Sequence, residues 1–171
     1  LSITLFNSEL ENEIDGNSLD PITFRYTAIN KNGLRKRKGM ELNSYSKLKK
    51  DFTINFSYTY TDSIEINANN EYQEEVRRPR NISSLNVFWE PNDVINFNTS
   101  LYYNGKQKDV VFPNNVELSN YTIVNFRVNM NINNNLEGYI RLENLFDKNY
   151  EEVYGYQSLG LGAYLGLRYK L

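Results

Sequence analysis

The sequence predicts an all-β fold, an antiparallel up-and-down meander of about eight strands of a transmembrane β-barrel, which is either a small closed barrel or one arc of a larger barrel. Three observations support this prediction. Apolar and polar residues alternate with a period of two along most of the 171 residues. Short and long connections between these segments alternate along the chain, and aromatic residues gather at the segment ends. A period of two places successive side chains on opposite faces of a strand, so each strand has one apolar and one polar face.

The clearest alternation lies in residues 120–132, where Val124, Phe126 and Val128 share one parity and Asn125 and Arg127 share the other. Similar patterns predict the other strands. The second strand is expected to be interrupted at Asn32-Gly33, because this pair favours a turn. We expect the strands at residues 1–14, 22–47, 52–62, 79–90, 93–105, 119–132, 136–147 and 160–171.

Tight turns are expected at 49–51, 91–92 and 133–135, and connections of about a dozen residues or more at 63–78, 106–118 and 148–159. This order places all short turns at one end of the sheet and all long loops at the other. Outer-membrane barrels keep the short turns in the periplasm and the long loops outside the cell. The same orientation, with a periplasmic C-terminus, is therefore expected here.

A soluble, lipocalin-like ligand-binding barrel is an alternative, because it also alternates apolar and polar faces. Its outward face would be charged, whereas the polar face here consists mostly of Asn, Thr and Ser. The aromatic residues at the strand ends resemble the interfacial girdles of membrane barrels and favour the membrane reading. The expected girdle residues are Phe52, Tyr60, Trp89, Tyr103 and Tyr121, together with Tyr102.

The composition argues against catalysis. The chain has no Cys and no His, which excludes thiolate or imidazole metal sites, Ser–His nucleophiles and disulfides. Glu137 and Glu143 lie six residues apart on one predicted strand, or roughly 20 Å, which is too far for a glycosidase pair. We expect no enzymatic activity, no cofactor and no metal. About 27 residues are Asn, which we expect at inward strand positions and in turns.

Residues 144–156, NLFDKNYEEVYGY, closely resemble the signature near the C-terminus of TonB-dependent outer-membrane receptors. Other segments resemble elements of this family in the same order, so the resemblance covers essentially the whole chain. These segments are GMEL at 39–42, YTYTD at 58–62, RRP at 77–79, YNG at 103–105, YTIVN at 121–125 and LGLRYKL at 165–171.

The resemblance implies that residues 1–171 are the last eight strands of a 22-stranded barrel, without its plug domain. The start at Leu1, which is not Met, also suggests a piece of a longer protein. The implied function is uptake of cobalamin or a ferric siderophore, with the context of Gly155-Tyr156 closest to the cobalamin branch. The implied partners are this ligand, the lipid bilayer and lipopolysaccharide, the plug domain and TonB, and the barrel-assembly machinery. A self-sufficient eight-stranded outer-membrane barrel with a structural or adhesive role is the alternative.

The basic run Arg35-Lys36-Arg37-Lys38 is not expected to bind nucleic acid, because the chain carries a net charge of −2. Lipopolysaccharide phosphate, a neighbouring loop or water are better partners for this run. The carboxylates of the first long loop could bind a divalent cation, although their spacing fits no known loop.

Three groups of candidate functional residues follow. Those expected to face the lumen or plug are Arg127, Asn129, Glu137, Arg141 and Glu143. Those expected to contact ligand from the loops are Tyr72, Phe112, Tyr150, Tyr154 and Tyr156, although Tyr154 and Tyr156 also suit the outer girdle. The expected assembly signal comprises Gly166, Tyr169 and Leu171, and it departs from the family, whose barrels usually end in Phe. The Arg of a frequent Pro-Gly-Arg element is also replaced, since residues 159–161 read Leu-Gly-Leu.

Overall fold

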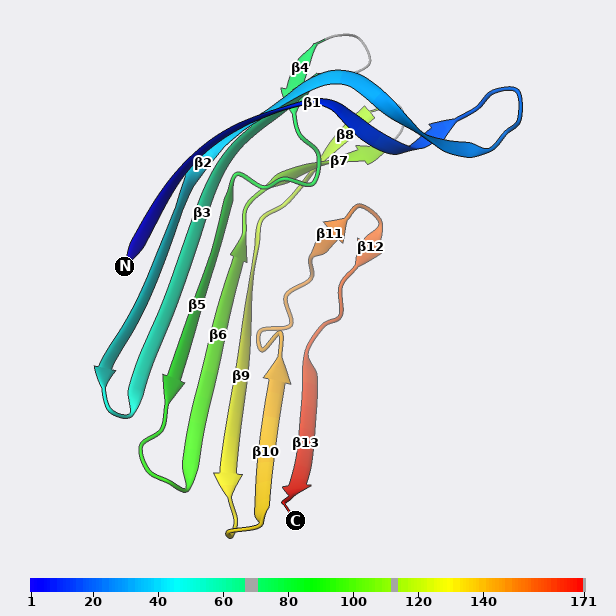
Figure 1. Ribbon diagram of the computed structural model, residues 1–171. Helices are drawn as coiled ribbons and strands as arrows, with labels where there is room; N and C mark the ends of the chain where they lie inside the picture. Colours follow the sequence, from blue (N-terminus) through cyan, green and yellow to red (C-terminus); the bar gives the residue numbers. More distant parts are fainter. Residues whose placement is uncertain (67–70, 112–113, 171) are drawn as a thin grey trace.

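The computed structural model describes residues 1–66, 71–111 and 114–170. Eight strands form the path of one antiparallel sheet, in the order β1-β2-β3-β5-β6-β9-β10-β13 (Figure 1). The eight predicted strands are therefore confirmed. Their bounds are β1 Ser2–Leu19, β2 Tyr26–Lys49, β3 Phe52–Ile66, β5 Asn81–Trp89, β6 Ile95–Asn104, β9 Tyr121–Asn131, β10 Leu136–Glu143 and β13 Gly162–Tyr169.

The predicted long loops contain further short strands. Strand β4 (Tyr72–Glu74) pairs with the far end of β3. Strands β7 (Gln107–Val111) and β8 (Asn114–Leu118) form one separate hairpin, and β11 (Glu151–Val153) and β12 (Tyr156–Gln157) form another. Both hairpins lie at the end of the sheet opposite to the short turns (Figure 1). Two of the predicted loops are therefore folded structures.

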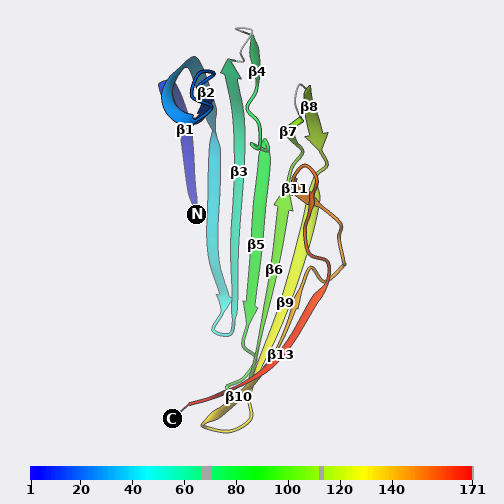
Figure 2. The same ribbon diagram turned by 90° about the vertical axis from the view of Figure 1, so that its right-hand side faces the viewer.

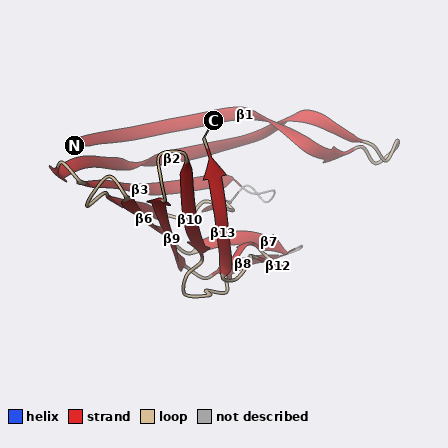
Figure 3. Cartoon of the chain, turned by 90° about the horizontal axis from the view of Figure 1, so that it is seen from below, coloured by secondary structure: helices blue, strands red, loops and turns tan. Residues whose placement is uncertain are grey.

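The sheet is curved and twisted, as the view from below shows: β1, β2 and β3 run across the direction of β10 and β13 (Figure 3). Within the described residues, β1 pairs with β2 alone and β13 with β10 alone, so the sheet is an open arc. The described residues contain no helix long and apolar enough to cross a membrane.

The expected interruption of the second strand is not a break. Strand β2 continues through Asn32-Gly33, but the pairing shifts there, from Glu11 opposite Leu34 to Glu13 opposite Lys31. One extra residue in β2 is a β-bulge, which bends a strand without ending it. The turn-forming pair thus changes the twist of the long β1–β2 hairpin.

The register divides the sheet into two faces, because residues directly opposite in an antiparallel pair point to the same side. One row across four strands is entirely polar: Asn55, Asn86, Ser100 and Asn125. The adjacent row is entirely apolar: Phe56, Leu85, Leu101 and Val124. The alternation seen in each strand therefore becomes a continuous polar face and a continuous apolar face.

Asn side chains are bonded to one another and to the backbone. On the polar face, Asn129 Nδ2 donates to Asn96 Oδ1 across β9 and β6 at 2.7 Å. In two short turns, Asn92 Oδ1 and Asn133 Oδ1 each accept two backbone N–H groups at 2.9 and 3.0 Å. This is the Asx-turn arrangement that favours Asn in turns, so both expected locations of the Asn excess are observed.

The apolar face carries no layer of protein over its large side chains. Leu165 on β13 is 81% exposed, and the buried hydrophobic residues among those described are Leu118, Tyr121 and Ile123. A water-soluble sheet would bury such a face, since each large apolar side chain contributes about 1.5–3 kcal/mol when it is buried. The exposed face fits a sheet that is covered by lipid.

On the polar face, the Tyr139 ring lies over Gly166, its direct partner in β13. The Arg127 guanidinium lies 4.8 Å from the centroid of the same ring. A side chain at position 166 would overlap this ring, so the glycine makes room for the Arg127–Tyr139 contact. Gly166, expected to belong to an assembly signal, has this packing role in the structure.

We predict that Gly166→Val destabilises the complete protein by about 1–3 kcal/mol, because overpacking displaces a well-packed ring. Gly138→Ala is the matched control, since Gly138 lies on the paired strand and its nearest neighbour, a flexible Ile132 side-chain atom, is 3.4 Å from the added Cβ. The measurement is the urea midpoint of unfolding in detergent. Equal midpoints for the two variants would contradict the packing role.

Candidate ligand-binding site at the long-loop end

Asp109 on β7 joins three segments that are distant in sequence. Its side chain is fully buried. It accepts hydrogen bonds from the backbone N–H of Tyr154 at 2.7 Å, the backbone N–H of Val110 at 2.8 Å and Arg77 Nε at 2.8 Å. The backbone N–H of Arg77 also donates to the Lys108 carbonyl at 2.7 Å. The β7–β8 hairpin, the β11–β12 hairpin and the segment before β5 therefore meet at one carboxylate.

Burial alone would raise the pKa of Asp109, because it penalises the charged form. The two backbone N–H donors and Arg77 outweigh this effect and hold the pKa below its ordinary value. The carboxylate is therefore ionised, and both of its oxygens accept hydrogen bonds, Oδ1 from Val110 and Arg77 and Oδ2 from Tyr154. A buried charge with this set of partners stabilises one arrangement of the loops, because losing a partner would leave the charge unpaired.

An aromatic cluster lies next to this junction. The rings of Tyr121 and Tyr150 have centroids 4.3 Å apart, and Tyr102 lies 6.3 Å from Tyr121. Tyr121 Oη donates to Glu152 Oε1 at 3.2 Å, and Gln107 Nε2 donates to the Glu152 carbonyl at 2.9 Å. The cluster thus attaches the β11–β12 hairpin to the ends of β6 and β9.

Tyr121 and Tyr102 differ from the expected girdle. They have the parity of Asn125 and Ser100, which places both rings on the polar face, and Tyr121 is buried. The register decides which face a side chain lies on, and a position near a strand end does not change that face. The other four expected girdle residues lie on the apolar face: Phe52, Tyr60, Trp89 and Tyr103. Phe52 is paired with Trp89, whose ring is stacked on Phe97 at 5.2 Å.

A cavity of about 470 Å³ lies between the two hairpin regions. Its lining combines tyrosine rings with amide and carboxylate groups, which suits a large ligand that carries both aromatic and polar groups. The lining residues are Glu117, Leu118, Ser119, Asn120, Lys148, Asn149, Tyr150, Glu151, Tyr154 and Gln157.

Glu75 forms a second junction, between the polar face and the segment after β4. Arg37 donates to both of its oxygens, from Nε at 2.8 Å and from Nη2 at 2.6 Å, and Ser63 Oγ donates a further hydrogen bond. Arg35 Nη1 lies 3.6 Å from the same carboxylate. Burial would raise the pKa of Glu75, but Arg37 and Ser63 outweigh it and lower the pKa to about 2.

The basic run is therefore divided between the two faces. Arg35 and Arg37 lie on the polar face against Glu65 and Glu75. Lys36 Nζ and Lys38 Nζ point to the other side, 3.0 Å from Glu9 Oε1 and 3.5 Å from Asp62 Oδ2.

The five residues expected to face the lumen share the polar face. Arg141 is paired with Arg127, and Tyr139 with Asn129, while Glu137 and Glu143 have the same parity as Arg141. Arg127 Nε donates to Asn129 Oδ1 at 2.8 Å. Arg141 Nη1 lies 3.4 Å from Glu143 Oε1, and Glu137 lies within 3.7 Å of Arg168 and Lys170.

The structure does not bring all the expected loop contacts together. Tyr150 and Tyr154 line the cavity, whereas Tyr72 on β4 and Tyr156, which is 74% exposed, do not belong to its lining. Phe112 lies outside the described residues, and so does Leu171 of the expected assembly signal. Tyr169 is exposed and is paired with Leu136. The described residues contain no group of acidic side chains placed to hold a metal ion.

A model of the β-barrel of TonB-dependent receptors matches residues 1–145. The chain belongs to the TonB-dependent receptor family. Members of this family are transporters and not enzymes, which confirms the expectation of no catalysis. A search of curated proteins gives no significant match.

Three solved receptor structures have a similar fold over the length of this chain. The siderophore receptor PiuA from Acinetobacter baumannii matches 98% of this chain and 25% of its own, with a TM-score of 0.77 and 20% identity. The ferripyoverdine receptor of the Pseudomonas aeruginosa outer membrane matches 98% of this chain and 24% of its own, with a TM-score of 0.74 and 19% identity. The ferric-catecholate import receptor Fiu from Escherichia coli K12 matches 98% of this chain and 24% of its own, with a TM-score of 0.75 and 17% identity. The chain thus spans about a quarter of these receptors. None of the three is described as a cobalamin receptor, so the expected cobalamin branch gains no support.

Sequence reasoning missed the residues that join the loops of this receptor: Arg77, Asp109 and Glu152, as well as the role of Glu75. Most of their partners come from segments 31 to 45 residues away, which local patterns do not show. The RRP element gave a partial signal, because Arg77 and Arg78 lie in it.

We predict that Asp109→Asn loosens both loop hairpins of the complete receptor. The amide cannot accept all three hydrogen bonds and leaves Arg77 without its carboxylate, at a cost of about 1.5–3 kcal/mol. Hydrogen exchange at the Tyr154 and Val110 amides should become faster by roughly tenfold or more. Asp51→Asn at a short turn is the control, and unchanged exchange in Asp109→Asn would contradict the role of this junction.

We predict an acid-sensitive contribution from Glu75. Its folded pKa of about 2 lies below the ordinary value of 4.5, so the contribution is complete above pH 4.5 and is lost as the pH falls towards 2. The difference in unfolding midpoint between the natural receptor and Glu75→Gln should therefore shrink between pH 5 and pH 2. Glu90→Gln at a short turn serves as control, and a constant difference would rule out the Glu75 junction.

Proposed function

We propose that this chain forms the C-terminal wall of an outer-membrane receptor of a Gram-negative bacterium, which takes up a ferric siderophore by TonB-dependent transport. The proposal depends on the family match over residues 1–145. The plug domain and the contact with TonB would come from parts of the receptor outside this chain. The long-loop end would be extracellular, and the short turns and the C-terminus periplasmic.

The two faces of the sheet support this function. Hydrocarbon cannot satisfy backbone groups, so a spanning sheet must be fully hydrogen-bonded and apolar on its lipid side. The open edges of β1 and β13 would pair with other strands of the larger barrel, which makes a self-sufficient eight-stranded barrel the less favoured alternative. The polar face would then line the lumen and meet the plug.

The loop cavity supports a ligand of siderophore size. Tyr150 and Tyr154 offer rings and hydroxyl groups, and the surrounding Asn and Gln side chains offer amide donors and acceptors. Such groups can bind a bulky chelate at its rim without touching the metal. Asp109 holds the backbone of Tyr154, and Glu152 is bonded to Tyr121, whose ring packs against Tyr150. The three receptors compared above are described as siderophore or ferric-chelate receptors, and we therefore favour a ferric siderophore over cobalamin.

The test is uptake of radioactive iron complexed with siderophores by a receptor-deficient strain that expresses the complete protein. Uptake should require TonB. The double variant Tyr150→Ala/Tyr154→Ala should weaken binding about tenfold or more, since aromatic hot-spot contacts each contribute about 1–2 kcal/mol. Tyr45→Ala, exposed at the short-turn end, is the control. Uptake of labelled cobalamin with no uptake of any ferric siderophore would contradict the proposed ligand class.

A further inference from the structure

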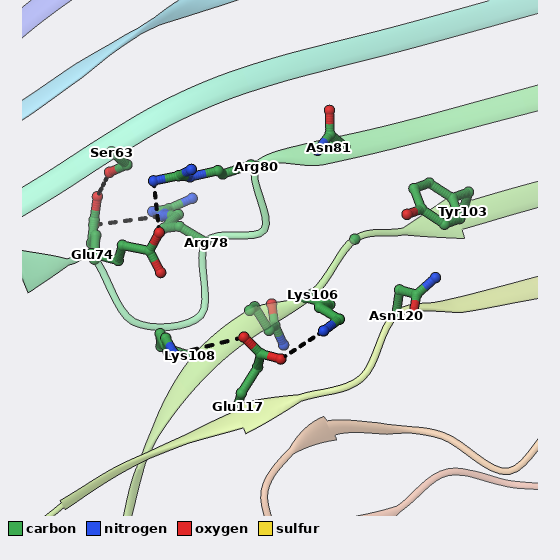
Figure 4. A pocket seen from close by; sticks show the side chains of 13 residues that line it. Ser63, Glu74, Arg78, Arg80, Asn81, Tyr103, Lys106, Lys108, Glu117 and Asn120 are labelled. Atoms are coloured by element: carbon green, nitrogen blue, oxygen red, sulfur yellow. Dashed lines mark hydrogen bonds and ion pairs between the residues drawn. The ribbon is translucent and has the colours of Figure 1, made fainter.

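The wall of the receptor is split just beyond Asn81, where β5 begins. There β3 continues with β4 on one side, and the β7–β8 hairpin continues on the other side (Figure 2). A cavity of about 380 Å³ occupies this split (Figure 4). Its cationic lining consists of Arg78, Arg80, Lys106 and Lys108.

The cavity lies next to the aromatic border of the apolar face, on the side of the long loops. Along β3, this face runs through Tyr58 and Tyr60 and then reaches Asp62, whose partner in β2 is Lys38. Two residues of strand span about 7 Å, so the change from aromatic to charged side chains is abrupt. In membrane barrels, such a border marks the level of the lipid headgroups.

The Arg80 guanidinium lies on the lipid side of this border. Its Nη2 is 2.7 Å from Glu74 Oε1 and 3.8 Å from Asp62 Oδ1. Glu74 is paired opposite Ile64, so Glu74 and Asp62 share the apolar face. Tyr103, the last apolar-face residue of β6, lines the same cavity and is followed by Lys106.

The cationic groups retain donors for a further partner. Arg80 is 53% exposed on its side chain, and within the described residues its ion pairs use Nη2 only. Arg78 contacts Glu75 through Nε, at 3.5 Å. Lys106 and Lys108 share one carboxylate, that of Glu117, at 2.9 and 3.6 Å. The lining thus carries four cations against the three carboxylates Glu74, Glu75 and Glu117.

The polar-face side of the cavity is already occupied. Ser63 and Glu75 line it there, and the Glu75 carboxylate accepts hydrogen bonds from both Ser63 and Arg37. A group that enters the cavity would therefore come from the lipid side. The Arg and Lys side chains that line the cavity are donors of the kind that bind phosphate oxygens well.

We propose that Arg78, Arg80, Lys106 and Lys108 form a site for a phosphate group of the lipid that surrounds the barrel. Tyr60 and Tyr103 would pack beside the glycerol or sugar part of the same headgroup. The site binds lipid and not the transported ligand. It rests on the proposed membrane location, and it leaves the loop cavity free for the ligand.

The test measures lipid binding to the complete receptor in detergent micelles by native mass spectrometry. The probe is lipid A with two phosphates, compared with the same lipid after removal of both phosphates. The variant Arg80→Gln/Lys106→Gln should weaken binding of the phosphorylated probe at least tenfold, since a charge-assisted contact contributes about a factor of ten. Lys47→Gln/Lys49→Gln at the short-turn end is the control of equal charge and should bind as the natural receptor does.

The conservative variant Arg80→Lys/Lys106→Arg keeps both charges and should bind the phosphorylated probe within about threefold. Equal binding by Arg80→Gln/Lys106→Gln and the natural receptor, or equal binding of both probes, would overturn the proposal. Full displacement of lipid A by the same concentration of inorganic phosphate would also overturn it, because the site would then recognise free phosphate. Uptake of ferric siderophore should stay unchanged in Arg80→Gln/Lys106→Gln. Absence of such uptake in the natural receptor would refute the proposed function and leave the lipid result standing.

Discussion

The antiparallel hydrogen-bond ladder is the constraint on which the rest of this structure depends. Each strand of the path is paired with its neighbours over most of its length, and one continuous register connects β1 to β13. The register gives each side chain a face, because a slip of one residue would exchange the two faces. The polar face, the apolar face and the aromatic border of the apolar face all follow from this alignment. On the polar face, the Tyr139 ring then packs between Gly166 and the Arg127 guanidinium.

At the long-loop end, where β5, β6 and β9 are no longer paired with one another, buried carboxylates hold the segments together. Asp109 and Glu75 each gather donors from segments that are far apart in sequence. Both remain ionised because their donors outweigh the effect of burial. The long-loop end is thus a fixed framework in which Tyr150 and Tyr154 are placed beside a cavity. Its outer margin carries the basic cavity of the split wall.

The sequence predicted the eight main strands and their two faces because a period of two is a local signal that one strand carries alone. It did not predict β7–β8 and β11–β12, whose stability comes from Asp109 and Glu152 and from partners in other loops. Tyr121 shows a different limit. Its parity with Asn125 was visible in the sequence, but its position near a strand end suggested the girdle. The register decides the face, and aromatic residues at strand ends can lie on either one.

The alternation of faces is the central claim, and the absence of native cysteine in this chain makes it directly measurable. Single cysteines at positions 124 to 129 of β9, in a complete receptor without other cysteines, would be labelled in native membranes with a water-soluble maleimide and with a lipid-confined reagent. We predict that positions 125, 127 and 129 react with the water-soluble reagent and that 124, 126 and 128 react with the lipid-confined one. Equal labelling of neighbouring positions, or the reverse order, would contradict the account.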